Sequence, residues 1–376
     1  MSDPATASPL TARHDRLAGA LSDAGLDALV LNPSPSLTYL TGLHFHLSER
    51  PVVGIFTPGG APALVLPELE AQKLEGAPFR AKAFTYSEDL STWGPAFREA
   101  AEAAGIEGKR VGVEPRSLRV LELRLLEKAA PDAAFVSGED AVAALRMRKD
   151  EAELALMRKA VVIAQNALEA TLPAVRPGVT EREIAAELIL HMLREGSDGE
   201  LPFQPIIAFG ANSANPHAVP TDYALQMGDL VLFDWGANER GYFSDLTRTF
   251  RMGGVDPELA KIADIVRRAN RAGFEAAGPG VPAGVVDDVA RKVIEDAGYG
   301  EYFVHRTGHG LGMEVHEEPY IRGDNERLLD VGMTFTIEPG IYLPGRGGVR
   351  IEDDVVITED GAESLSDLPR GLLPLG

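Results

Sequence analysis

The sequence predicts an α/β domain followed by an α+β domain with an approximate internal repeat, over residues 1–135 and 145–376 respectively. Three observations predict this fold class. The chain has 376 residues, a length that suits two or three domains. Its first third alternates helical and short apolar strand patterns. In the remainder, the tripeptide Pro-Gly-Val occurs at residues 177–179 and again at 279–281, each time between two predicted helices.

The elements of the first domain follow from apolar spacing and from turn residues. A helix from Leu10 to Ala24 ends at Gly25, a residue type that favours helix termination. Apolar runs bounded by Pro, Gly and Asn predict strands over residues 28–31, 52–56, 63–66 and 111–113. Helical spacing predicts two further helices, over residues 93–104 and 117–129. This order of elements is typical of an α/β domain.

Side-chain caps mark the helices of the second domain. Asp150 and Glu153 form a capping pair that begins a long helix, which ends before Pro173. Thr180 and Glu183 form a capping box for the next helix. The second half of the repeat is predicted to begin with helices after Asp256 and over residues 285–297.

Composition excludes several classes of function. With 36 basic and 57 acidic residues the formal charge is −21, which argues against nucleic acid as a partner because phosphate binding needs a basic surface. The chain has no cysteine, so any metal must be held by Asp, Glu, His or backbone oxygen. No signal peptide and no apolar run long enough to span a bilayer are found. We therefore expect a cytoplasmic protein without a membrane partner.

A β-hairpin predicted over residues 230–250, with a four-residue turn, contains two acidic side chains. If Ala237 pairs with Tyr242, Asp234 and Asp245 lie directly opposite each other on one sheet face, with Cβ atoms roughly 5 Å apart. Like charges at such positions are destabilising, so a metal ion is expected between them. The alternative is a shifted register that leaves one aspartate facing solvent.

Two glutamates occupy corresponding places in the second half. Glu338 ends an apolar strand, and Glu352 lies in the last strand, which is predicted to run from Val349. They follow Asp234 and Asp245 by 104 and 107 residues, close to the spacing of the Pro-Gly-Val pair. The two acidic pairs are therefore interpreted as counterparts across an internal two-fold. Two further acids, Asp353 and Asp354, compete with Glu352 for this role.

Histidine completes the candidate set. Four of the eight histidines, His217, His305, His309 and His316, lie in motif-like settings, and glycines flank His309 on both sides. Two aspartates, two glutamates and one histidine form an oxygen-rich set that suits a pair of divalent cations such as Mn, Co or Zn. Two such ions can hold a hydroxide and direct it at a carbonyl carbon.

These residues resemble the pita-bread metallopeptidases, which include methionine aminopeptidase, aminopeptidase P and prolidase. The match covers residues from about 150 to 365, and it rests on Phe-Ser-Asp-Leu-Thr-Arg-Thr, Gly-His-Gly-Leu-Gly, Glu-Pro-Gly-Ile-Tyr and Val-Arg-Ile-Glu-Asp. The first domain, with Tyr39-Leu40-Thr41-Gly42, resembles the creatinase-type domain of the proline-specific members. The resemblance implies a creatinase-like α/β domain followed by a pita-bread catalytic domain with an internal pseudo-two-fold.

The resemblance also implies a role for each candidate ligand. Asp234 would bind one metal, Asp245 and Glu352 would bridge both, and His309 and Glu338 would complete the other site. Glu338 would also be the general base for a bridging hydroxide. The expected cofactor is two divalent ions per chain. Manganese is the preferred metal, with cobalt or zinc as alternatives.

Further residues are expected around the metals. His217 and His316 would stabilise the tetrahedral intermediate and carry a proton to the leaving proline nitrogen, since a tertiary amide leaves poorly otherwise. His305 and Arg350 would line the pocket on the side that holds the substrate proline. For Arg350 the alternative is a salt bridge that orients Glu352.

The expected activity is that of an Xaa-Pro dipeptidase acting on small peptides with proline at the second position. The short stretch between Glu338 and Glu352 resembles compact prolidases, and His305, Arg306, Arg346 and Arg350 are candidate partners for the substrate carboxylate. The alternatives are aminopeptidase P, which acts on longer peptides, and a non-catalytic scaffold of the same fold.

The resemblance implies a homodimer, because in this family the first domain of one subunit often walls the site of the other. Residues 44–50 are the candidate wall, and Arg50 is a candidate clamp for the substrate carboxylate. The alternative for this segment is a plain surface loop.

Overall fold

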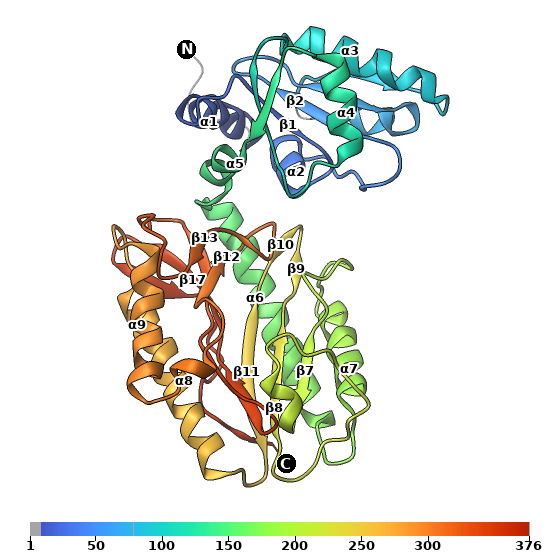
Figure 1. The fold of residues 1–376 in the computed structure, drawn as a ribbon. Helices are drawn as coiled ribbons and strands as arrows, with labels where there is room; N and C mark the ends of the chain where they lie inside the picture. The colour runs from blue at the N-terminus through green and yellow to red at the C-terminus, as the bar shows by residue number, and fades with distance from the viewer. Residues whose placement is uncertain (1–8, 78, 376) are drawn as a thin grey trace. The chain divides into compact units, whose positions relative to one another are not determined.

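The computed structural model describes residues 9–77 and 79–375, which divide into two compact units between Arg146 and Met147 (Figure 1). The first unit is built on one six-stranded sheet with the order β4-β3-β2-β1-β5-β6. Strands β1, β5 and β6 are parallel, whereas β2 runs antiparallel to both β1 and β3. The predicted α/β character of this part of the chain is confirmed.

The strands of the first unit are β1 (Ala28–Leu31), β2 (Val53–Phe56), β3 (Ala63–Pro67), β4 (Lys82–Tyr86), β5 (Arg110–Val113) and β6 (Ala134–Ser137). Its helices are α1 (Pro9–Asp23), α2 (Pro35–Thr41), α3 (Trp93–Ala104), α4 (Val120–Ala129) and α5 (Glu139–Arg146), with short 3-10 helices at Glu68–Leu74 and Leu90–Thr92. The helix predicted from Ser117 begins three residues later, because Ser117 and Leu118 close a turn on the carbonyl of Glu114.

The second unit contains four long helices, α6 (Glu151–Thr171), α7 (Glu181–Arg194), α8 (Pro257–Ala276) and α9 (Ala283–Asp296). Both predicted capping boxes are present, with Asp150 and Thr180 as the N-caps of α6 and α7. Short 3-10 helices lie at Leu172–Ala174, Gly210–Ala214 and Gly300–Tyr302. None of the helices in the described ranges is long and apolar enough to cross a membrane.

Two principal sheets lie between these helices. The first has the order β19-β11-β8-β7 and the second β13-β12-β14-β17-β18. The first comprises β7 (Ile206–Phe209), β8 (Leu230–Trp235), β11 (Leu246–Met252) and β19 (Pro374–Leu375). The second comprises β12 (Gly308–Gly310), β13 (Glu317–Ile321), β14 (Thr334–Ile337), β17 (Asp353–Thr358) and β18 (Gly361–Ser364). Two small hairpins are β9 (Asn238–Glu239) with β10 (Tyr242–Phe243), and β15 (Gly340–Leu343) with β16 (Gly347–Arg350).

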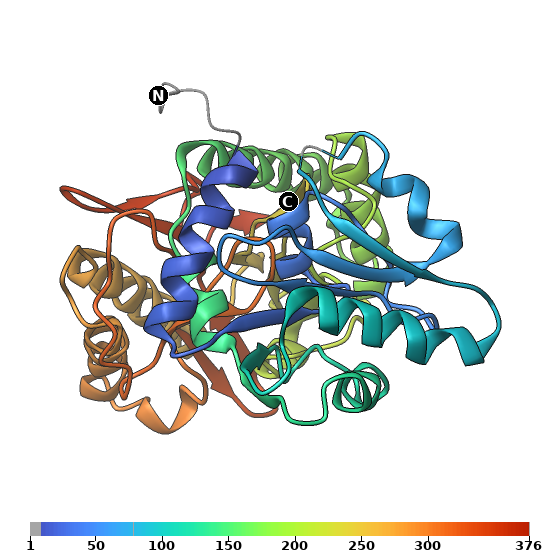
Figure 2. The same ribbon diagram turned by 90° about the horizontal axis from the view of Figure 1, so that it is seen from above.

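The internal repeat is visible in the order of strands. The three main strands that follow α6 and α7 lie side by side in the order β11-β8-β7. Three strands that follow α8 and α9 lie in the matching order β17-β14-β12, so the same arrangement occurs twice. Helices α8 and α9 lie side by side (Figure 2). Thr247 and Glu352 join the two halves, since each backbone N–H donates to the other residue's carbonyl. The predicted pseudo-two-fold is therefore confirmed.

The register of the hairpin differs from the predicted one. Arg240 and Gly241 have φ angles of 52° and 81°, so they form a two-residue turn of the kind that suits hairpins, in place of the predicted four-residue turn. Asp234 consequently pairs with Thr247 and does not face Asp245. Since Asp245 lies two residues before Thr247, the two aspartates are diagonal neighbours on one face.

The predicted last strand is interrupted at the candidate ligand. β16 ends at Arg350, which pairs with Gly340, whereas β17 begins at Asp353, which pairs with Ile337. Glu352 lies at this break, where the backbone changes partner strands. Glu338 likewise follows the last residue of β14 directly. The candidate ligands thus lie where strands end, near the junction of the two halves.

Candidate metal centre

A cavity of about 650 Å³ lies within the second unit. Phe203, Ile206, Pro216, Ala218 and Val315 form apolar parts of its wall. The charged and imidazole side chains that line it are Asp234, Asp245, Glu338, Glu352, His217, His305, His309, His316, Arg306 and Arg350. All five residues predicted as metal ligands therefore face one space, together with the three histidines and Arg350 that were expected around them.

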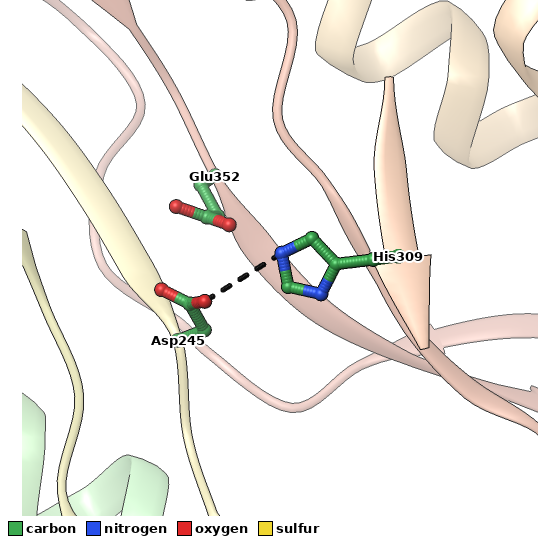
Figure 3. Close-up of side chains that lie close together, drawn as sticks. All are labelled: Asp245, His309 and Glu352. Atoms are coloured by element: carbon green, nitrogen blue, oxygen red, sulfur yellow. Dashed lines mark ion pairs between the residues drawn. The ribbon is translucent and has the colours of Figure 1, made fainter. Parts of the chain in front are cut away.

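Three of the candidate ligands converge most closely (Figure 3). One oxygen or nitrogen from each of Asp245, His309 and Glu352 lies within 4.8 Å of the other two, and all three side chains are buried. Oδ1 of Asp245 is buried and has no hydrogen-bond partner among the described residues. His309 Nε2 lies 3.7 Å from Asp245 and 3.4 Å from Glu338 Oε1. These gaps between buried acceptor atoms fit a cation bound between them.

The orientation of His309 leaves its Nε2 free to bind a metal. Its Nδ1–H donates to the carbonyl of Gly310 at 3.2 Å, and burial lowers the pKa of the imidazole well below its usual value. The ring is therefore neutral, with the lone pair of Nε2 directed at the carboxylates. The flanking glycines allow the neighbouring strands to approach closely, because a Cβ on Gly308 would lie 1.8 Å from the carbonyl oxygen of Thr336.

Glu352 and Asp245 are held by groups from both halves of the unit. Thr247 Oγ1 donates to Glu352 Oε2 at 2.6 Å. The backbone N–H of Asp245 donates to both oxygens of Asp354, at 3.2 and 3.0 Å. Asp354 thus supports the backbone of a candidate ligand and is absent from the cavity wall.

The other competing acid, Asp353, belongs to a separate buried network. It accepts hydrogen bonds from Arg248, Arg370 and Ser366. Burial raises the pKa of this carboxyl, but the two arginines outweigh it and leave the pKa below its usual value. Arg248 also donates to the carbonyls of Thr247 and Glu352, so this network fastens the two strand segments that carry ligands.

Arg350 orients Asp234. Its Nη2 donates to Asp234 Oδ2, its Nε donates to Thr247 Oγ1 at 3.1 Å, and its Nη1 donates to the hydroxyl of Tyr342 at 2.9 Å. The guanidinium is buried, and no hydrogen bond to the Glu352 side chain is formed among the described residues. The partner of this arginine is therefore a carboxylate 116 residues away in sequence, not the one two residues along.

His305 lies at the end of the same hydrogen-bond chain. Its Nδ1 contacts the carbonyl of Arg306 at 2.7 Å and must carry the proton, so Nε2 accepts from the Tyr342 hydroxyl at 2.8 Å. Burial first, and then the charge of Arg350, lower the pKa of His305 to about 4. The ring is thus neutral near pH 7.

The four acids carry pKa values above their usual range. Burial is the main cause for each, and for Asp245 and Glu352 the neighbouring carboxylates add to it. The pKa of Glu338 rises to about 8, and that of Asp234 also rises although Arg350 opposes the shift. A buried carboxylate cluster of this kind is stable in its charged form only beside added positive charge. The donor set therefore fits divalent metal ions.

Of the remaining predicted residues, three line the cavity and two do not. His316 stacks edge to face on His309 with ring centres 4.2 Å apart, and Arg306 lies over the ring of Tyr320 at 4.4 Å. His217 is exposed on the segment after β7 and lines the same cavity.

Two predicted arginines are absent from the cavity wall. Arg346 is an exposed residue that pairs with Asp256 and Glu258. Arg50, in the first unit, pairs with Glu88 at 2.8 Å and with Glu49.

Sequence reasoning missed Tyr342 and Thr247. Tyr342 stands in the Glu-Pro-Gly-Ile-Tyr motif four residues after Glu338, and Thr247 stands two residues after Asp245. Its spacing from Asp245 could have indicated Thr247, because an even spacing along a strand places residues on one face. No such spacing links Tyr342 to Glu338, since β14 ends at Ile337 and β15 begins at Gly340. The polar contacts of both residues, however, come from segments distant in sequence.

The fold and the candidate ligand set are those of a metal-dependent hydrolase. A family model described as metallopeptidase family M24 matches residues 155–359, and a model described as the creatinase/prolidase N-terminal domain matches residues 13–148. The chain belongs to metallopeptidase family M24.

Similar proteins agree with this assignment. The crystal structure of dipeptidase PepE from Mycobacterium ulcerans is 37% identical, covers 98% of each chain and superposes with a TM-score of 0.91. A prolidase from Thermococcus sibiricus is 33% identical, covers 98% of this chain and 100% of its own, and has a TM-score of 0.92. The Xaa-Pro dipeptidase of Lactobacillus delbrueckii subsp. lactis is 36% identical over 348 residues, 92% of this chain and 94% of its own.

Proposed function

We propose that this chain is an Xaa-Pro dipeptidase, which hydrolyses the imide bond of dipeptides with proline at the second position. The observation that carries the proposal is the set of two aspartates, two glutamates and one histidine that line one cavity, together with Arg306 and three further histidines. The relatives named Xaa-Pro dipeptidase and prolidase support the substrate class.

Asp234, Asp245, His309, Glu338 and Glu352 would hold two divalent ions, manganese by preference, with Asp245 and Glu352 shared between them. Such ions lower the pKa of bound water and polarise a carbonyl. Carboxylate oxygens dominate this donor set, which favours manganese over softer metals.

The chain's own groups supply the proton transfers. Glu338 lines the cavity, and its carboxylate accepts the proton of the attacking water. His217 and His316 donate hydrogen bonds to the oxygen that becomes negative, and one of them carries the proton that Glu338 has accepted to the proline nitrogen as it leaves.

Arg306 is the proposed partner for the substrate carboxylate. It lines the cavity, and in the described part of the chain no carboxylate lies within ion-pair distance of its guanidinium. Arg350 is already paired with Asp234, and a neutral His305 can orient a carboxylate but supplies no charge. A fixed cation beside the scissile bond selects a free carboxylate there, which is the mark of a dipeptide substrate.

Comparing Ala-Pro with Ala-Pro-Ala tests the proposal. We expect hydrolysis of Ala-Pro by the manganese-loaded protein and at least about tenfold lower kcat/KM for the tripeptide, since its proline carboxyl is an amide and cannot pair with Arg306. Equal cleavage of both peptides would instead identify an aminopeptidase P. Absence of cleavage of either peptide would point to a non-catalytic scaffold.

A homodimer in the cytoplasm is also proposed. His44, His46 and Leu47 are exposed, and Lys73 and Arg119 hold this segment by donating to the carbonyls of His44 and Ser48. An ordered, exposed segment of this kind suits contact with a second copy. Sedimentation analysis of the protein tests the dimer, and the KM of an Arg50→Ala variant for Ala-Pro tests the proposed role of Arg50 as a clamp for the substrate carboxylate.

A further inference from the structure

Glu181 is a fully buried carboxylate that lies outside the cavity wall. It is the first residue of α7, directly after the N-cap Thr180. Both of its oxygens accept hydrogen bonds from Asn212 Nδ2, at 2.9 Å each. Oε1 also accepts from the N–H of Phe209 at 2.7 Å, and Oε2 accepts from the N–H and the hydroxyl of Thr221 at 2.8 and 2.6 Å. A carboxylate with this many donors is held in one position.

All of these donors belong to one segment, residues 209–221, which we call the His217 loop. Phe209 and Asn212 lie at its beginning and Thr221 at its end, so one carboxylate fastens both ends of the loop. Between them, the hydroxyl of Ser213 accepts a hydrogen bond from the N–H of Gly348 at 2.9 Å. Gly348 lies in β16, the strand that also carries Arg350. The loop starts at the end of β7, which packs against α7 (Figure 1).

The part of the loop that lines the cavity is held by far fewer side-chain hydrogen bonds. The N–H of His217 donates to Oδ1 of Asn215 at 3.2 Å, and Pro216, His217 and Ala218 all line the cavity. His217 itself is exposed, so its position depends on the fixed ends of the loop. An exposed side chain on a loop tip is otherwise among the more mobile parts of a protein.

We propose that Glu181 is a positioning residue that holds the His217 loop, and with it the imidazole of His217, against the cavity. The catalytic consequence rests on the role of His217 in the proposed function, whereas the ordering of the loop does not. Loss of the clamp would displace His217 without removing it, and a displacement near 1 Å can lower a rate on the order of a hundredfold.

The test is the Glu181→Gln variant with Glu183→Gln as its matched control. A glutamine at position 181 turns an NH2 group toward N–H donors, so it loses acceptor capacity at the same size. Glu183 lies two residues further along the same helix turn and is exposed, and glutamine also satisfies a capping box. Both variants are measured as manganese-loaded full-length protein.

Hydrogen–deuterium exchange gives a readout that does not depend on activity. In Glu181→Gln we expect faster exchange of peptides covering residues 209–221, with unchanged exchange across 230–235 in the neighbouring strand β8. In Glu183→Gln we expect no change in either region. Unchanged protection of the loop in Glu181→Gln would overturn the proposal, even if activity falls.

A double-mutant cycle tests the link to His217. We expect Glu181→Gln to lower kcat for Ala-Pro roughly tenfold to a hundredfold with less than about threefold change in KM. In a His217→Ala background it should lower kcat no further, because the imidazole it positions is gone. Independent losses that multiply in the double variant would overturn the positioning role.

A milder variant keeps the test decisive if Glu181→Gln does not fold. Asn212→Ala removes only the side chain that contacts both oxygens, and we expect the same pattern with a smaller amplitude. If the wild-type protein cleaves no proline peptide, the proposed function fails while the exchange experiment still decides whether Glu181 orders the loop. Normal loop protection in both variants would exclude the clamp.

Discussion

The guanidinium of Arg350 donates a hydrogen bond to Oδ2 of Asp234, and both side chains are buried. The same guanidinium bonds Thr247 and the hydroxyl of Tyr342. Arg350 therefore provides positive charge within a cluster of four acids, three of them buried, and fixes the direction in which Asp234 presents its second oxygen. A residue that orients a metal ligand in this way affects both metal affinity and activity.

Replacing Arg350 should lower activity and manganese affinity together. Arg350→Lys keeps the charge but cannot make three hydrogen bonds in one plane, so we expect kcat/KM and manganese affinity to fall roughly 10–100-fold. Arg350→Ala should also cost about 3–5 kcal/mol of stability, because it leaves Asp234 buried without its partner. Isothermal titration with manganese and peptide kinetics measure the two effects.

The control for this prediction is Arg271→Lys. Arg271 is an exposed arginine on α8 that pairs with Glu275 four residues away. We expect its replacement to change neither manganese affinity nor kcat/KM, and to alter stability by less than about 0.5 kcal/mol. An Arg350→Lys variant that behaves like this control would refute the orienting role.

The number of metal ions should depend on which ligand is removed. Asp245→Ala and Glu352→Ala each remove an expected bridging ligand, so both ions should be lost, whereas Asp234→Ala should leave one. Elemental analysis of the dialysed variants counts the ions, and a chelator should abolish the activity of the wild-type protein. Glu359→Ala, an exposed acid seven residues after Glu352, is the control and should keep both ions. Equal loss of a single ion in all three ligand variants would contradict the bridging assignment.

Arg306 should determine how tightly the substrate is bound. Arg306→Ala removes the cation proposed for the proline carboxylate, so KM for Ala-Pro should rise at least about tenfold, while the tripeptide Ala-Pro-Ala should be little affected. Steady-state kinetics with both peptides gives the comparison. A parallel loss for the two peptides would show that Arg306 does not read the carboxylate.

The convergence of the five candidate ligands on one cavity could be predicted from the sequence, because the four acids lie beside apolar strand residues and His309 lies between two glycines. Buried acids in such settings need a cation whatever the details of pairing. Helix starts at Asp150 and Thr180 could be predicted for a similar reason, since caps are made within a few residues. Local chemistry was sufficient in these cases.

Two kinds of feature could not be predicted in this way: a backbone conformation that the residue type disfavours, and contacts between segments distant in sequence. Arg240 adopts a left-handed conformation that arginine rarely takes, and the resulting tight turn moves the partner of Asp234 by two residues, from Asp245 to Thr247. The partner of Arg350 is Asp234, because packing of the two halves brings β8 beside β16, whereas spacing along one strand suggested Glu352. Tyr342 enters the site through the same packing.

The stability of the metal-free protein should fall as the pH rises. Burial raises the pKa of Glu338 to about 8, and raises those of Asp245 and Glu352 as well, so the folded state keeps protons that the unfolded chain releases above about pH 4.5. A group whose pKa is raised by folding stabilises the protein below its unfolded pKa, and this contribution is lost as the pH rises toward the folded pKa. In chelator we therefore expect Tm to be at least about 5 °C lower at pH 8 than at pH 5.

Manganese should reverse this trend, because metal binding needs the deprotonated ligands and so stabilises more at pH 8 than at pH 5. Differential scanning calorimetry at both pH values, with chelator and with manganese, measures the four melting temperatures. Glu338→Gln removes the group that titrates near pH 8, so its metal-free melting curve should depend less on pH. If the metal-free wild type and Glu338→Gln show the same pH dependence, Glu338 does not carry its proton into the folded state.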